Sequence, residues 1–221
     1  MALPLTARKP DWLKIRPPGG ENYSEIKALL RELKLHTVCE EAACPNVSEC
    51  WGGGTATLML MGDTCTRGCK FCHVKSGNPQ GLLDLEEPTK VATALAKLGL
   101  TYVVLTSVDR DDLPDGGADH FGRTVEETKK RIPEMLIEVL TPDFRGDKKA
   151  IARVIASGVD VFAHNIETIS RLQNKVRDGR CSYEQSLEVL RYAKELRPAV
   201  YTLSLIHISE PTRLRRKSYA V

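Results

Sequence analysis

The chain has 221 residues, 42% of them hydrophobic and 28% charged, which is typical of a soluble globular domain with a sizeable core. Its apolar runs are far shorter than the roughly 20 residues that span a bilayer, and "MALPLTARKPDWLKI" lacks the apolar segment of a signal peptide, so we expect a cytoplasmic protein. Residues 204–221 hold four of the 32 basic and one of the 29 acidic residues, so the rest of the chain is neutral and we expect no nucleic-acid or membrane binding.

Hydrophobic periodicity predicts one N-terminal helix and then a regular alternation of strands and helices. Ser24 is expected to cap the first helix, whose apolar positions are Ile26, Leu29, Leu30 and Leu33. Later helices are predicted after Pro88, over 122–131, after Asp147, and from the Ser182/Gln185 capping box to Leu196. Short apolar runs predict buried strands at 57–61, 102–105, 135–140, 159–162 and 199–202.

This alternation predicts an α/β fold. Strands that are apolar on both faces and alternate with amphipathic helices indicate a parallel sheet covered by helices. Right-handed crossovers would curl such strands into a barrel or a doubly wound sheet. We expect a cysteine-rich N-terminal extension over 1–55, the strand and helix repeat over 56–202, and a disordered tail over 203–221.

Six of the seven cysteines form two triplets with different internal spacings. The first triplet, spaced C-x4-C-x5-C, is Cys39, Cys44 and Cys50, and the second, spaced C-x3-C-x2-C, is Cys65, Cys69 and Cys72. Clustered thiols in a reducing compartment suggest metal ligands, and soft thiolates suit iron–sulfur clusters or zinc. Three thiolates on one loop can hold three corners of a cubane cluster, whereas structural zinc needs a fourth ligand that His73 is too close to provide. Spacing alone favours the cluster over zinc, leaves buried non-ligand cysteines as a third possibility, and sets Cys181 apart as a free thiol.

The triplets also resemble a known family. "CTRGCKFC" at 65–72 resembles the C-x3-C-x-aromatic-C signature of radical S-adenosylmethionine enzymes, and "CEEAACPNVSEC" at 39–50 resembles the auxiliary-cluster motif of the lipoyl synthase family. Together with "TSVDRDDLPDGGADH" and "HNIET" they resemble that family over roughly residues 10 to 202. The resemblance implies a partial parallel (β/α) barrel of the radical S-adenosylmethionine type, with about five of six strands present.

The resemblance also implies a reaction with two 4Fe-4S clusters. The cluster on the second triplet would chelate S-adenosylmethionine at its open iron and cleave it to a 5′-deoxyadenosyl radical. The auxiliary cluster on the first triplet would then supply two sulfur atoms to an octanoyl chain on a lipoyl carrier protein. An unactivated methylene has no acidity that a side-chain base could use, which suits radical chemistry. Ferredoxin or flavodoxin is the implied electron donor.

Six further residues are implied to contact S-adenosylmethionine: Phe71 near the adenine, Gly116 and Gly117 near the methionine part, Asn165 and Glu167 by hydrogen bonds, and Arg177 at the carboxylate. Glu167 would bind the ribose hydroxyls. The residues alone leave other interpretations open: "DGG" as a turn, Glu167 as an acid at a helix N-terminus, and Arg177 as solvated surface. His120 and His164 are expected to be structural.

After Thr202 the sequence departs from the family pattern. The resemblance implies a sixth strand and a C-terminal serine as fourth ligand of the auxiliary cluster, which this chain does not show. "RKSY" at 216–219 is only superficially similar to that motif, so Ser218 is not assigned as the ligand. We therefore expect a C-terminally truncated copy with a foreign tail, a labile auxiliary cluster and impaired activity.

Three alternatives remain at this point. A biotin-synthase-like radical sulfurtransferase is disfavoured by the first triplet upstream of the radical signature. A zinc-binding interaction module without chemistry would contain zinc and no sulfide. An iron–sulfur electron carrier is suggested by "CP" at Cys44–Pro45, but the spacings do not match and five strands exceed that role.

Overall fold

The computed structural model describes residues 19, 21–41, 44, 46–52 and 55–207. Its main sheet has six strands in the order β1-β2-β5-β6-β7-β9. β1 is antiparallel to β2, and the other neighbours are parallel. The strands are β1 (His36–Thr37), β2 (Thr55–Leu60), β5 (Tyr102–Ser107), β6 (Leu136–Leu140), β7 (Val161–Ala163) and β9 (Tyr201–Leu203). The predicted partial α/β barrel is confirmed; among the strands of this main sheet, the edge strand β1 was not expected.

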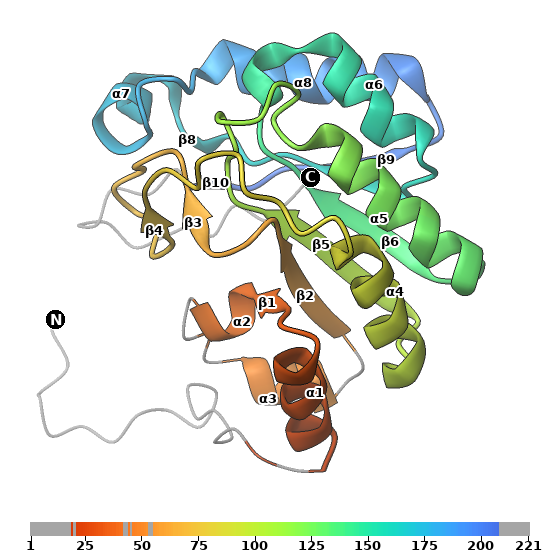
Figure 1. Cartoon of the computed structure of the whole chain (residues 1–221). Helices are drawn as coiled ribbons and strands as arrows, with labels where there is room; N and C mark the ends of the chain where they lie inside the picture. The colour runs from red at the N-terminus through yellow and green to blue at the C-terminus, as the bar shows by residue number, and fades with distance from the viewer. Residues whose placement is uncertain (1–18, 20, 42–43, 45, 53–54, 208–221) are drawn as a thin grey trace, which may run out of the picture.

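Four long helices cover the outer face of the curved sheet, as the prediction of crossover helices requires (Figure 1). They are α4 (Glu87–Leu98), α5 (Ala118–Arg131), α6 (Lys148–Ala156) and α8 (Tyr183–Leu196). The N-terminal helices lie together at the β1 and β2 edge (Figure 1) and are α1 (Glu21–Glu32), α2 (Val38–Glu41) and α3 (Val47–Gly52).

The predicted helix ends have clear local causes. The Asp147 carboxylate accepts a hydrogen bond from the Lys149 N–H at the start of α6, and the Ser182 hydroxyl accepts one from the Gln185 N–H at the start of α8. Gly99 ends α4 in the left-handed conformation, with φ of 60°.

Two predicted helix starts were wrong. α1 begins at Glu21, so Ser24 lies inside its first turn and does not cap it. α5 begins at Ala118, ahead of the predicted residue 122, because the Asp115 carboxylate accepts hydrogen bonds from the Gly117 and Asp119 N–H groups.

The hydrophobic core lies between the sheet and the four long helices. Side chains alternate along a strand, so Leu58 and Leu60 of β2 pack in this core while Thr57 and Met59 face the concave side. The helices contribute Val91, Leu95, Phe121, Val125, Ile151, Val154 and Val189 to the same core. The concave face of the sheet is therefore available for a functional site.

Short elements line the carboxyl ends of the strands. β3 (Thr64–Cys65) pairs with β4 (Lys75–Ser76), and β8 (Glu167–Thr168) pairs with β10 (Ile206–His207), both in parallel. The 3-10 turns η2 (Phe144–Gly146) and η3 (Ser170–Leu172) and helix α7 (Gln173–Val176) complete this end.

The expected tail boundary at 202 falls inside β9. Residues 203–207 continue along β8 through β10, so this part of the expected tail is built into the molecule. The remainder of the tail, including Ser218 and the "RKSY" motif, lies outside the described residues.

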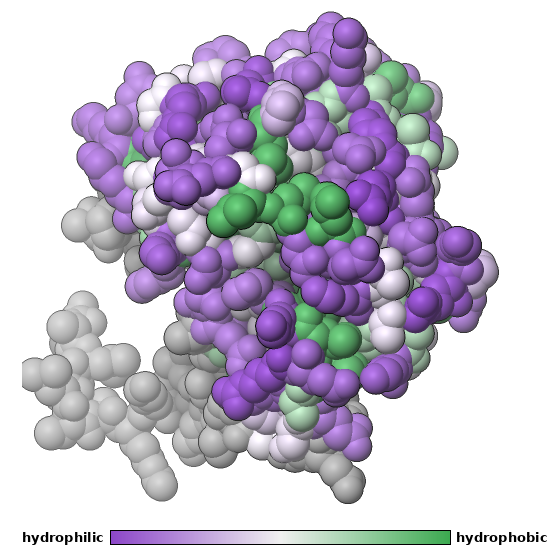
Figure 2. All heavy atoms as spheres, viewed as in Figure 1, coloured by the Kyte–Doolittle hydropathy of each residue, from purple (hydrophilic) through white to green (hydrophobic). Residues whose placement is uncertain are grey.

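The face drawn in Figure 2 is mostly hydrophilic, with an apolar area at its centre over the connection between β4 and α4. Leu82 and Leu85 of that connection have 76% and 60% of their surface exposed.

Candidate active site at the carboxyl ends of the strands

A cavity of about 260 Å³ opens on the concave side, where β2, β5, β6 and β7 end. In a parallel sheet this end collects the loops that follow each strand, and it is the usual place for catalysis. The predicted site residues on its wall are Cys65, Phe71, Cys69, Cys72, Asn165, Glu167 and Arg177. The fold therefore brings together residues that are widely separated in sequence.

The second triplet begins with Cys65, the last residue of β3, and continues on the loop that leads to β4. The Cys65 carbonyl accepts a hydrogen bond from the Gly77 N–H at 2.8 Å, which closes the loop at its base. Two backbone groups point at sulfur: the Arg67 N–H lies 3.4 Å from Cys65 Sγ, and the Asp178 N–H lies 3.3 Å from Cys69 Sγ. Amide donors of this kind stabilise a thiolate, which is the form that binds iron.

An iron–sulfur cluster and a single metal ion need differently spaced ligands. Within the part of the chain that the structure describes, no three His, Cys, Asp or Glu side chains are placed to bind one metal ion. Each thiolate of a cubane cluster binds a different iron, so its ligands lie further apart than those of one zinc ion. His164 on the cavity wall is already engaged through both ring nitrogens, with the Thr141 carbonyl at 2.9 Å and the Ser186 hydroxyl at 3.0 Å.

Burial raises the pKa of the Cys65 thiol to about 11. In the metal-free chain this thiol is therefore neutral near pH 7. Binding of iron to Cys65 must release its proton, so cluster assembly here is coupled to proton loss.

The first triplet belongs to the N-terminal helices and the turn between them. Cys39 lies in α2 and Cys50 in α3, and the Cys44 N–H donates to the Cys39 carbonyl at 3.0 Å. Burial raises the pKa of Cys50, and the charges of Cys39 and Cys44 add to the shift. Val38, adjacent to Cys39, is part of the cavity wall.

Asn165 and Glu167 follow β7, as predicted, and both line the cavity. The Asn165 Oδ1 accepts a hydrogen bond from the Leu205 N–H at 3.3 Å. Glu167 has a φ of 67°, a left-handed conformation that is costly for a residue with a side chain and is concentrated at functional sites. Glu167 starts no helix; it lies in the two-residue strand β8, so the alternative of a helix N-terminal acid was wrong.

Arg177 is buried, with 8% of its surface exposed, so the alternative of a solvated surface residue was also wrong. Its Nη1 donates to the Ser186 hydroxyl at 2.9 Å and to the Gln173 Oε1 at 3.1 Å. Its Nε finds no hydrogen-bond partner among the described residues. A buried guanidinium with an unused donor on a cavity wall is suited to an anionic ligand.

Gly116 and Gly117 are not on the cavity wall. Both have a positive φ, 63° and 87°, and they form the turn that leads into α5. A Cβ on Gly116 would lie 3.2 Å from Phe144, and one on Gly117 would lie 2.2 Å from the sulfur of Met61. The structure therefore gives these glycines a turn and packing role.

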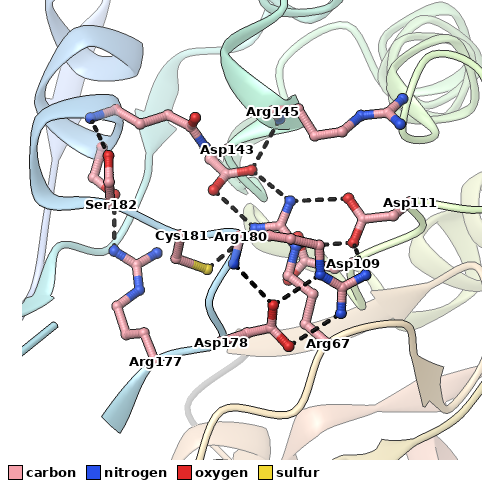
Figure 3. Close-up of polar contacts among 12 residues, drawn as sticks. Arg67, Asp109, Asp111, Asp143, Arg145, Arg177, Asp178, Arg180, Cys181 and Ser182 are labelled. Carbon is pink, nitrogen blue, oxygen red and sulfur yellow. Dashed lines mark hydrogen bonds and ion pairs between the residues drawn. The ribbon is translucent and has the colours of Figure 1, made fainter. Parts of the chain in front are cut away.

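An ionic network that the sequence did not reveal holds the site together (Figure 3). The Arg67 guanidinium makes two 2.8 Å hydrogen bonds to Asp143 and two 2.9 Å hydrogen bonds to Asp111. Asp109 lies 3.3 Å from Arg67 Nε, and burial raises the pKa of Asp109 to about 7 although the Arg67 charge opposes the shift. Arg67 thus anchors the second-triplet loop to the ends of β5 and β6.

A second arginine links the same loop to residues 177–181. Arg180 donates to the Thr66 carbonyl at 2.7 Å and to the Asp178 carboxylate at 2.8 Å. The Asp178 carboxylate in turn accepts from the Gly68 N–H at 3.0 Å. The contact between Arg180 and Asp178 is drawn in Figure 3.

Cys181 was expected to lie apart from both triplets, and the structure corrects this. It is 6% exposed, lines the cavity together with Cys69 of the second triplet, and accepts a hydrogen bond from Arg67 Nη1 at 3.2 Å. Sequence separation hides this contact, because loops from different strands meet only in the folded sheet.

Comparison with known proteins agrees with this geometry. The Radical SAM superfamily profile matches residues 59–212, and the profile for the N-terminal domain of lipoyl synthase of the Radical SAM family matches residues 5–44. The chain belongs to the Radical SAM superfamily, whose match continues past Thr202.

The curated relatives are lipoyl synthases. The mitochondrial lipoyl synthase of Bos taurus is 60% identical over 204 residues, which cover 90% of this chain and 55% of the relative. The lipoyl synthase of Thermus thermophilus is 57% identical over 201 residues, which cover 91% of this chain and 62% of the relative. The chain thus spans little more than half the length of these relatives.

Two solved structures share the fold. Methylornithine synthase aligns with a TM-score of 0.53 at 19% identity, covering 84% of this chain and 54% of its own. The FeFe-hydrogenase maturase HydG from Carboxydothermus hydrogenoformans aligns with a TM-score of 0.53 at 15% identity, covering 79% and 46%. Among the described residues, every helix is too short or too polar to cross a membrane.

Proposed function

We propose that this chain carries the sulfur-insertion chemistry of a lipoyl synthase, acting on an octanoyl chain attached to a lipoyl carrier protein. The observation that carries the proposal is a cavity lined by all three cysteines of the second triplet and by Val38, the residue next to Cys39 of the first triplet. The match of residues 5–44 to the lipoyl synthase N-terminal profile supports this over other radical sulfurtransferases.

In this proposal the cysteines of the second triplet hold a 4Fe-4S cluster, and those of the first hold the auxiliary cluster. When bound, the radical cluster supplies one electron and an open coordination position for S-adenosylmethionine. The residues Cys65 and Cys69 are prepared for this by the backbone N–H groups aimed at their sulfurs.

The other cavity residues bind and orient the S-adenosylmethionine. Arg177, whose Nε has no hydrogen-bond partner among the described residues, pairs with the carboxylate of S-adenosylmethionine. Asn165 and Glu167 form hydrogen bonds to S-adenosylmethionine, Glu167 at the ribose hydroxyls. Phe71, 47% exposed at the cavity, offers a face for the adenine.

The rest of the cavity wall suits an alkyl chain. Apolar side chains from five segments of the chain line it: Val38, Met59, Val74, Val108 and Leu140. These side chains exclude water, which protects a carbon radical from side reactions. An octanoyl chain entering here would lie beside the cysteines of the second triplet.

The partners belong to the same proposal: an octanoylated carrier protein as substrate, and ferredoxin or flavodoxin as electron donor. The cytoplasmic location stays a prediction, to be checked by cell fractionation. The relative from Bos taurus is described as mitochondrial, so the compartment is a separate question from the chemistry.

The test is anaerobic turnover of the reconstituted chain with S-adenosylmethionine, a strong reductant and an octanoylated carrier, followed by mass spectrometry. We expect 5′-deoxyadenosine and a carrier that has gained two sulfur atoms. Cys65→Ala should abolish both products, and Cys39→Ala should abolish only sulfur insertion. Sulfur insertion that survives Cys39→Ala would refute the roles given to the two triplets.

A further inference from the structure

We propose that Tyr23 and Lys27 of α1 are positioning residues for the cluster on the first triplet: they hold in place the two segments of the chain that carry Cys39 and Cys50. The inference rests on the proposed function only in requiring that this triplet binds a cluster. Neither the cysteine spacing nor the names of the relatives assign a role to α1.

The first contact of α1 is with the residue that follows Cys50. The Tyr23 ring stacks on the Trp51 ring, with the ring centroids 5.0 Å apart and an angle of 29° between the planes. Trp51 is buried in the hydrophobic core together with Ile26 and Leu30 of the same helix. An aromatic stack stabilises beyond the area that it buries, and it fixes the relative orientation of the two rings. Helix α3, which carries Cys50, is therefore attached to α1 directly beside the cysteine (Figure 1).

The second contact of α1 is with the residue that follows Cys39. Lys27 lies one helical turn after Tyr23 on the same face of α1, and its Nζ is 5.6 Å from the centre of the Tyr23 ring. The same Nζ lies 3.4 Å from Glu40 Oε1. This ion pair is partly exposed and contributes little stability, so we assign the larger effect to the aromatic stack and a smaller one to Lys27.

The Cys39 segment has a further support from the main sheet. The Cys39 N–H donates to the Thr37 hydroxyl at 3.1 Å, and that hydroxyl donates to the Thr57 carbonyl of β2 at 2.8 Å. Since this support does not involve α1, loss of the Tyr23 ring should release mainly the segment that carries Cys50. Each thiolate of a cubane cluster binds a different iron, so the ligands must be held at fixed separations for the cluster to persist. Movement of Cys50 relative to Cys39 should therefore weaken this cluster.

The second triplet is supported by other residues. Arg67 anchors its loop to Asp111 and Asp143, and neither Tyr23 nor Lys27 is on the cavity wall. Loss of the Tyr23 ring should therefore leave the second-triplet cluster unchanged. Such a selective effect separates a positioning role from a general contribution to folding, which would weaken both clusters alike.

The experiment measures how long each cluster persists in the full chain after anaerobic reconstitution. Two parents are used: Cys65→Ala, which leaves only the first-triplet cluster, and Cys39→Ala, which leaves only the second. In each parent, Tyr23→Ala removes the ring, Tyr23→Phe keeps it, and Lys27→Met removes the cation. Iron and acid-labile sulfide are counted first, and the loss of the visible absorbance of the cluster is then followed after addition of a ferrous-iron chelator.

Tyr192→Ala is the matched control in both parents. Tyr192 is also partly buried against the hydrophobic core, and it also has a lysine over its ring, with Lys148 Nζ 5.0 Å from the ring centre. It lies on α8, which carries no cysteine of either triplet. Circular dichroism of each variant compares the folded content with that of its parent.

We expect Tyr23→Ala to accelerate loss of the first-triplet cluster about tenfold, which is the upper end of what one aromatic pair contributes, and to leave the second-triplet cluster unchanged. Tyr23→Phe should stay near the parent, Lys27→Met should accelerate the loss about twofold, and Tyr192→Ala should change neither cluster.

An unchanged rate in Tyr23→Ala would overturn the inference while leaving the proposed function standing. Equal acceleration for both clusters, or in Tyr23→Phe or Tyr192→Ala, would do the same, because the effect would then not depend on the stack beside Cys50. A Cys65→Ala parent that binds no iron would overturn the role proposed for the first triplet, and the inference with it.

Discussion

Replacement of Arg67 by methionine should destabilise the fold more than the loss of any surface ion pair. The Arg67 side chain is 2% exposed and that of Asp143 is fully buried, so the variant would leave carboxylates buried without their cation. Breaking a buried pair from one side costs about 3–5 kcal/mol. Asp111 would keep the Thr66 hydroxyl at 2.9 Å and Arg180 at 3.2 Å, so the main loss falls on Asp143. We expect Arg67→Met to lower the free energy of unfolding by about 3–5 kcal/mol.

The assay is urea unfolding of the iron-free chain at pH 7, followed by circular dichroism. Arg153→Met is the matched control: Arg153 also makes three short contacts to carboxylates, at 2.7, 2.8 and 3.0 Å, but its side chain is 29% exposed. Arg153→Met should lower the free energy of unfolding by no more than about 1 kcal/mol. Equal losses for the two variants would refute the argument that burial, and not the number of contacts, makes Arg67 important. The difference in free energy of unfolding between the parent and Arg67→Met should also decrease toward pH 5, because the carboxylates left without a cation take up protons.

Three further predictions follow from single residues. Burial lowers the pKa of His164 to about 4, below its ordinary 6.5. The folded chain therefore favours the neutral imidazole. The free energy of unfolding that this preference contributes is fully present above pH 6.5 and is lost as the pH falls through 4. His164→Gln should lose less unfolding free energy between pH 7 and pH 5 than the parent, and an identical loss would contradict this assignment. Gly117→Ala should lower the free energy of unfolding in urea by about 2–3 kcal/mol, because the added Cβ clashes with Met61 and the residue has a positive φ. Gly99→Ala, with a positive φ but open space around it, should lower it by only about 1–2 kcal/mol. Equal losses in the two variants would contradict the packing argument. Arg177→Gln should weaken S-adenosylmethionine binding by about tenfold to a hundredfold in equilibrium dialysis, while Arg191→Gln on the exposed face of α8 should not change it.

Much of the fold could be read from the sequence because its signals are local. Runs such as "YVVL" mark buried strands, and Asp147 and Ser182 mark helix starts by hydrogen bonds only two or three residues away. The two-residue strand β1 gives no such pattern, so it was missed. The early start of α5 was missed because Asp115 was taken as part of a glycine motif and not as its cap.

The site was predictable where chemistry is concentrated in sequence, and not where it depends on long-range contacts. The cysteine triplets are short motifs with diagnostic spacing. Arg67 instead pairs with Asp111 and Asp143, 44 and 76 positions away, and reaches Cys181 at a separation of 114. Only the closing of the sheet brings these residues together, which is why Cys181 was expected to lie apart.

The central claim is that the two triplets are separate cluster sites. Its most direct test is to count iron and acid-labile sulfide in the anaerobically reconstituted chain, beside Cys65→Ala and Cys39→Ala. We predict iron and sulfide for two cubane clusters in the parent, and about half in each variant, because each substitution removes a ligand of only one cluster. Zinc without sulfide, or an iron content unaffected by both substitutions, would contradict the account.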